Sequence, residues 1–167
     1  MIYVIGIPLM AFAAILQSVV VNNIQILNGR PDLALLLLVA AALYFGIKPS
    51  LILALFTGFF LDLLSGLPLG LTSLELLFVV FMISFTENRF WTINILVLEI
   101  ITLAASVLFH LLMAGIQILT GSSIPFTDAL VRIILPSTFL NMIFILPIAY
   151  IGYQIKTRIE EEQEPVN

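Results

Sequence analysis

Four ionisable side chains stand inside long apolar runs and raise the question of what chemistry they serve. Asp62 lies in GFFLDLLSGLPLG, residues 58–70, behind phenylalanines and leucines and ahead of a Ser-Gly-Leu-Pro-Leu-Gly break. Glu75, Glu99 and His110 have equally apolar neighbours. A charge within a bilayer costs at least about 2.5 kcal/mol on insertion scales. Each group therefore needs a partner, a wet vestibule or a function.

Enzymatic chemistry finds little support in the sequence. With one histidine and no cysteine, the chain cannot build a multi-histidine or thiolate metal site. The sequence contains no G-x-S-x-G elbow, no Walker loop and no H-E-x-x-H motif. We therefore expect no catalytic residue, no metal and no cofactor. The sequence also has no basic patch, so we expect no nucleic-acid partner.

A proton or ion relay is a further hypothesis, which rests on Asp62, Glu75 and Glu99. Glu99 and His110 are three helical turns apart, so they share a face but lie about 16 Å from each other along the axis. They are not expected to bond to each other. Interhelical hydrogen bonds are the alternative role for these groups.

The composition indicates that lipid is the solvent of this chain. Of its 167 residues 62% are hydrophobic and 10% are charged, whereas soluble domains have about a quarter charged residues. Apolar residues come in long runs and not in alternation, which favours helices over strands. We therefore predict a single-domain, all-α integral membrane protein, built as a compact bundle of six transmembrane helices.

The six predicted helices cover approximately residues 3–21, 33–47, 50–65, 69–86, 91–119 and 128–155. The first run has no Lys or Arg at its start and no convincing cleavage site, so we expect a retained helix and not a signal peptide. Residues 1–155 form the transmembrane domain in this scheme. Residues 156–167 form a solvated cytoplasmic tail.

Prolines and a glycine indicate where these helices start or bend. Pro49 is expected at the entrance of the third helix, where proline is tolerated. The fifth helix is long enough to tilt, or to break near Gly115. Pro136 and Pro147 predict kinks in the sixth helix.

The basic residues predict the orientation. With six spans, one side of the membrane holds Lys48, Arg89, Lys156 and Arg158, while the other holds Arg30 and, just inside the sixth helix, Arg132. This asymmetry favours both termini in the cytoplasm.

Asp62 then lies near the outer, negative end of the third helix dipole, which is unfavourable for a carboxylate. Two hypotheses account for it. Either its carboxylate snorkels or hydrogen-bonds to neighbouring backbone, or it meets Arg30 or Arg132. In the second case Asp32 and Asp128 serve as helix N-caps and leave the arginines available.

The break after Asp62 predicts a non-helical connection at the outer surface. Gly66 and Gly70 permit unusual backbone angles, and Pro68 fixes one. The connection is either a tight interhelical turn or a rigid platform that presents Leu67 and Leu69 to a partner.

Residues 29–74 resemble the core of the MreD family of rod shape-determining membrane proteins. The matching features are the Pro-Asp that enters the second span, the glycine in the third, and the D-x-x-S-G-x-P-x-G that ends it. The chain length and the six-span layout also fit. The family is in turn similar to the substrate-binding S components of energy-coupling-factor transporters, which implies a compact six-helix bundle with an outward-facing cavity.

The resemblance implies a non-enzymatic scaffold of the bacterial elongation (Rod) complex in the cytoplasmic membrane. Such a protein binds MreC, a single-span protein with a periplasmic coiled coil. It is thereby linked indirectly to MreB, to RodA and to its class B penicillin-binding transpeptidase, and so to cell shape and peptidoglycan synthesis. The polar cluster expected to bind the partner or to shape its surface comprises Arg30, Asp32, Asp62, Pro68, Gly70, Asp128 and Arg132.

The main alternative is a substrate-binding subunit of an energy-coupling-factor vitamin transporter. Such a subunit needs small residues on its first helix, where Ala14 and Ser18 make a single small-xxx-small step. It also needs several convergent polar side chains for the vitamin, and the sequence offers few.

Overall fold

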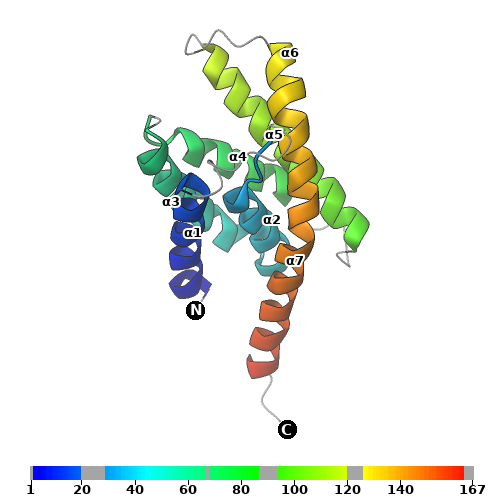
Figure 1. Cartoon of the computed structure of the whole chain (residues 1–167). Helices are drawn as coiled ribbons and strands as arrows, with labels where there is room; N and C mark the ends of the chain where they lie inside the picture. Colours follow the sequence, from blue (N-terminus) through cyan, green and yellow to red (C-terminus); the bar gives the residue numbers. More distant parts are fainter. Residues whose placement is uncertain (1, 20–28, 67, 87–93, 120–125, 164–167) are drawn as a thin grey trace.

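The computed structural model describes residues 2–19, 29–66, 68–86, 94–119 and 126–163. All regular elements of these residues are helices (Figure 1): α1 (Ile2–Val19), α2 (Leu33–Phe45), α3 (Ile47–Ser65), α4 (Leu71–Ser84), α5 (Ile95–Leu119), α6 (Phe126–Ala129), the π-helix η2 (Leu130–Ile134) and α7 (Leu135–Gln163). Each of the first five predicted helices overlaps one observed helix, and the sixth overlaps the run from α6 to α7. The all-α prediction is confirmed.

The helices fall into two groups by length. α3, α5 and the run Thr127–Ile159 are each long and apolar enough to cross a membrane, whereas α1, α2 and α4 are apolar but shorter. These long apolar helices fit an all-α membrane protein. Six crossings remain a prediction.

α2 is the centre of the fold. It packs against α1, α3, α4, α5 and α7, which surround it in Figure 1. Eight of its thirteen residues are buried, and they lie on all sides of the helix. A helix that is apolar all round requires neighbours all round. With thirteen residues α2 is only about 20 Å long, and its first turn begins among the other helices.

The α3–α4 pair has the most extensive helix–helix contact in the described residues. A Cβ atom added to Gly58 would overlap the backbone of Ser73, so the two helices touch where only glycine fits. The Ser73 hydroxyl donates to the Leu55 carbonyl across the same contact, at 3.2 Å. The glycine of the third span is therefore a packing residue.

The proline at 136 is accommodated by a wider turn. The N–H of Leu135 bonds to the carbonyl of Leu130, five residues back, at the end of η2. Because Pro136 has no N–H to donate, a local π-turn re-spaces the hydrogen bonds in front of it. Pro147 lies inside the continuous helix α7.

Two helix ends and one helix interior differ from the expectation. α3 already begins at Ile47, so Pro49 lies in its first turn. α5 runs unbroken through Gly115, so the break proposed there does not occur. α7 continues to Gln163, so the segment predicted as a tail begins as helix.

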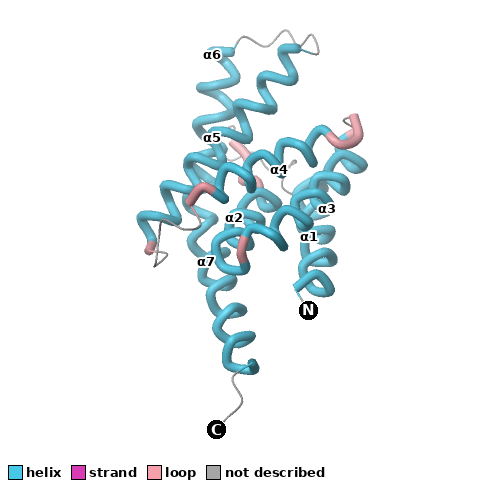
Figure 2. The backbone as a smooth tube through the Cα atoms, turned by 180° about the vertical axis from the view of Figure 1, so that it is seen from behind, coloured by secondary structure: helices cyan, strands magenta, loops and turns pink. Residues whose placement is uncertain are grey.

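The start of α1 and the end of α7 lie toward the same end of the molecule (Figures 1 and 2).

The Gly58 contact gives a first prediction. Gly58→Ala should lower the free energy of unfolding by about 1–3 kcal/mol, because the backbone of Ser73 cannot move aside as a flexible side chain could. Thermal unfolding in a mild detergent measures it. Gly115→Ala is the matched control, since a Cβ there meets nothing within 4 Å, and it should stabilise α5 by up to about 1 kcal/mol. Equal melting temperatures for the two variants would contradict the packing role.

Candidate functional site

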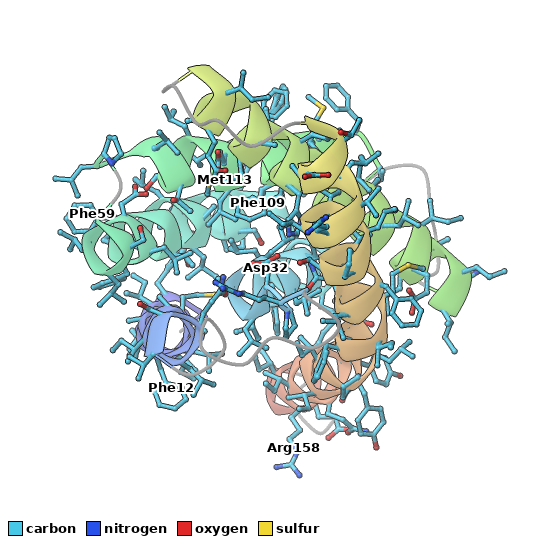
Figure 3. The ribbon with its side chains drawn as sticks, turned by 45° about the horizontal axis from the view of Figure 1, so that its top comes forward. Phe12, Asp32, Phe59, Phe109, Met113 and Arg158 are labelled. Atoms are coloured by element: carbon cyan, nitrogen blue, oxygen red, sulfur yellow. The ribbon has the colours of Figure 1, made fainter. Side chains whose placement is uncertain are left out.

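Asp32 lies at the centre of the molecule (Figure 3). It occupies the N-cap position of α2, yet its side chain makes no capping hydrogen bond. The predicted capping role is therefore wrong for Asp32. Gln17 of α1 takes that role instead, because its Oε1 accepts from the N–H of Ala34 at 2.9 Å.

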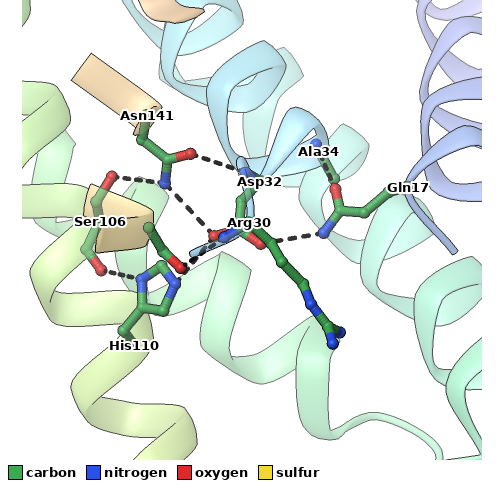
Figure 4. A network of polar contacts seen from close by, with 8 residues as sticks. Gln17, Arg30, Asp32, Ala34, Ser106, His110 and Asn141 are labelled. Atoms are coloured by element: carbon green, nitrogen blue, oxygen red, sulfur yellow. Dashed lines mark hydrogen bonds and ion pairs between the residues drawn. The ribbon is translucent and has the colours of Figure 1, made fainter. Parts of the chain in front are cut away.

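The Asp32 carboxylate collects side chains from three other helices (Figure 4). Its Oδ1 accepts from Gln17 Nε2 at 3.2 Å. Its Oδ2 lies 3.1 Å from His110 Nε2 and accepts from Asn141 Nδ2 at 3.4 Å. α1, α5 and α7 therefore converge on one carboxylate at the start of α2.

His110 faces an acceptor with each ring nitrogen. Nδ1 lies 2.7 Å from the Ser106 carbonyl oxygen, one turn back on α5, and Nε2 faces Asp32 Oδ2. Both nitrogens donate only in the imidazolium form, so this geometry suits an imidazolium–carboxylate pair. The two side chains are 11% and 14% exposed. Removing one partner of such a shielded pair leaves the other charge uncompensated, which is strongly destabilising.

The backbone ahead of α2 is satisfied by side chains of α7. Asn141 Oδ1 accepts from the N–H of Asp32 at 2.7 Å, and Asn141 Nδ2 donates to Ser106 Oγ at 3.1 Å. Ser137 Oγ accepts from the N–H of Arg30 at 3.0 Å. Non-helical backbone inside a membrane protein has to be covered by protein in this way.

Asp62 is 1% exposed and bonds to backbone, so the first of the two hypotheses is the correct one. Its Oδ2 accepts from the N–H of Gly70 at 2.8 Å, and its Oδ1 accepts from the N–H of Thr72 at 3.0 Å. These are N–H groups at the start of α4, so a carboxylate at the end of α3 caps the next helix at its positive end.

The cap holds the turn between α3 and α4. Gly66 ends α3 with φ +71°, and Gly70 precedes α4 with φ +93°. Both angles lie in the left-handed region that favours glycine. Pro68 is exposed and Leu69 is 64% exposed, while Leu67 lies outside the described residues. The D-x-x-S-G-x-P-x-G pattern thus encodes a capped turn.

The arginines of the predicted cluster do not pair with Asp62 in the described residues. Arg30 contributes its backbone N–H to the Asp32 network, and Figure 4 shows its guanidinium pointing away from it. Asp128 in α6 and Arg132 in η2 are both exposed. Neither arginine forms an ion pair with Asp62 in the part of the chain that the structure describes.

Glu75 differs from the two aspartates. It is 3% exposed, and neither carboxyl oxygen has a hydrogen-bond partner among the described residues. Glu99 Oε2 is also buried without a partner there. No group of three metal-ligating side chains occurs in the described residues.

Sequence reasoning missed the polar residues of the Asp32 network, which are Gln17, Ser106, Ser137 and Asn141. The available signal was an uncharged polar residue within an otherwise apolar helix. Such residues bond across helices in membrane proteins, although the sequence does not say to which neighbour.

The helices are apolar, and the polar groups around Asp32 and Asp62 are buried and bond to other groups of the protein. These features place the protein in the class of helical membrane proteins. A comparison with protein families then gives the family. The model of the rod shape-determining protein MreD matches residues 1–154, so the chain belongs to the MreD family, as the resemblance implied. No curated protein and no solved structure matches.

The network gives a second prediction. Asn141→Leu keeps the branching of the side chain, although leucine is larger, and leaves the Asp32 N–H without its acceptor, which should cost at least about 1–3 kcal/mol of unfolding free energy. Thermal unfolding in detergent measures the loss. Gln154→Leu, on the exposed part of the same helix, should change the melting temperature little. If both variants melt like the wild type, the network does not hold the helices together.

Proposed function

We propose that this protein is a non-enzymatic scaffold of the bacterial elongation complex that captures MreC in the cytoplasmic membrane. Membership of the rod shape-determining MreD family supports this role. Contacts with RodA, the class B transpeptidase and MreB are indirect in this proposal. Both termini lie in the cytoplasm, as the distribution of basic residues predicts.

The observation that carries the proposal is the capped turn between α3 and α4. Two carboxylate–backbone bonds and two left-handed glycines hold an apolar residue, Leu69, at the surface. An exposed apolar side chain on a fixed backbone loses little entropy when a partner covers it. The turn therefore offers a pre-organised docking point for an MreC segment.

A third prediction tests the docking point. Leu69→Ser should lower MreC capture several-fold, because an anchoring apolar contact is lost while the capping bonds of Asp62 remain. Co-purification of tagged protein from native membranes in mild detergent, followed by mass spectrometry, measures it. Leu96→Ser, at a 72% exposed position of α5, is the control and should capture MreC like the wild type. An equal loss in both variants would argue against a specific docking point.

Asp62 gives a fourth prediction. Asp62→Ala should weaken MreC capture without abolishing membrane insertion, because the turn loses both of its bonds to the carboxylate. Asp62→Asn should retain part of the capture, since the amide oxygen still accepts one of them. Capture and membrane content are measured on the same samples. Full capture by Asp62→Ala would contradict the proposed role of the turn.

The transporter alternative predicts a different set of captured proteins. An ATPase pair with its transmembrane subunit would then co-purify in place of MreC and cell-wall synthases. A vitamin site would also need several convergent polar side chains. The groove between α3, α4 and α5 has only Ser73 and Glu75 as polar side chains in its wall.

A further inference from the structure

A groove of about 1050 Å³ opens between α3, α4 and α5. Its wall is almost entirely apolar and includes Leu55 and Phe59 of α3, Leu74 and Phe78 of α4, and Leu112 of α5. All of these helices are apolar and two of them are long enough to span a membrane. The volume is at the upper end of the range for ligand pockets. Such a wall suits a hydrocarbon chain.

Glu75 is the one ionisable side chain in this wall. It is 3% exposed, and both of its carboxyl oxygens are without a partner in the described part of the chain. Asp62, at the same depth of burial, accepts two backbone N–H groups. Asp62 shows that this fold can supply hydrogen-bond donors to a buried carboxylate. Among the described residues it supplies none to Glu75. A buried acceptor without a donor is costly.

We propose that the groove binds a membrane phospholipid with a primary-ammonium head group, whose N–H groups reach Glu75 while an acyl chain fills the groove. The ammonium supplies both a positive charge and hydrogen-bond donors to the carboxylate. His110 interacts with Glu75 electrostatically, but neither carboxyl oxygen has a hydrogen-bond donor among the described residues, and no Lys, Arg or His lines the groove there. The hydrogen-bond donors therefore have to come from the ligand. Head-group binding requires side chains beside Glu75 to turn aside, because they cover its carboxyl oxygens.

Phosphatidylethanolamine and phosphatidylcholine form a matched pair for the test. Both carry a positive charge, but the ethanolamine head has N–H donors and the choline head has none. The purified protein is reconstituted in nanodiscs with equal amounts of the two lipids, re-extracted in mild detergent, and analysed for retained lipid by native mass spectrometry. We expect the wild type to retain phosphatidylethanolamine about tenfold over phosphatidylcholine. Equal retention would overturn the proposal.

Two variants locate the effect. Glu75→Gln should reduce the preference to less than about twofold, because it removes the charge but keeps the side-chain shape. Glu99→Gln is the control, since Glu99 Oε2 is also buried without a partner but Glu99 is not part of the groove wall. It should keep the wild-type preference. A preference that survives in Glu75→Gln would overturn the assignment to this carboxyl.

A measurement on the wild type covers the case in which Glu75→Gln does not fold. Dicyclohexylcarbodiimide enters the lipid phase and labels carboxyl groups there. Labelling of Glu75, read by peptide mass spectrometry, should be several-fold slower in phosphatidylethanolamine nanodiscs than in phosphatidylcholine nanodiscs. Equal labelling rates would count against an occupied groove. Capture of MreC by the same preparations is scored separately, so a failure of the lipid site is distinguishable from a failure of the proposed scaffold function.

Discussion

The backbone of a membrane protein has to find its hydrogen-bond partners without bulk water, and the arrangement of this fold depends on that constraint at two helix starts. Where α4 begins, the Asp62 carboxylate accepts from two backbone N–H groups. Where α2 begins, Gln17 and Asn141 supply the acceptors, and Asp32 serves as the point on which their amides and His110 converge. Because α2 packs against five other helices, fixing its first turn also fixes α1, α5 and α7 around it.

The polar contacts require close packing, and two glycines provide it. A Cβ on Gly29 would lie 2.6 Å from backbone atoms of Pro136 and Ser137, beside the bond from Arg30 to Ser137. A Cβ on Gly58 would overlap Ser73, whose hydroxyl bonds back to α3. Where backbones touch, short side chains such as serine reach across the contact. The glycines thus allow the backbones to approach, and the hydrogen bonds form across the same contacts.

The sequence predicted the helices well because apolar runs report directly on segments that cannot face water. It predicted the break after Asp62 from the glycines and the proline that follow, and the family from the order of short motifs around that break. It did not decide between backbone and arginine as the partner of Asp62. Both are compatible with the charge, and only the folded turn shows that two N–H groups lie within reach. The His110–Asp32 pair could not be predicted, since it depends on how α5 rotates against α2, and apolar runs without a polar face carry no information on rotation.

The shielded carboxylates of this protein therefore fall into two groups, those with hydrogen-bond partners and those without. Asp32 and Asp62 bond to groups on neighbouring helices and so hold those helices together. Glu75 has no hydrogen-bond partner in the described residues, and the lipid that we propose for the groove would supply one. Pro68, Leu69 and Gly70 belong both to the capped turn and to the wall of the Glu75 groove. The proposed lipid and the proposed partner would therefore share this turn, and by linkage each would change the affinity of the other by the same factor.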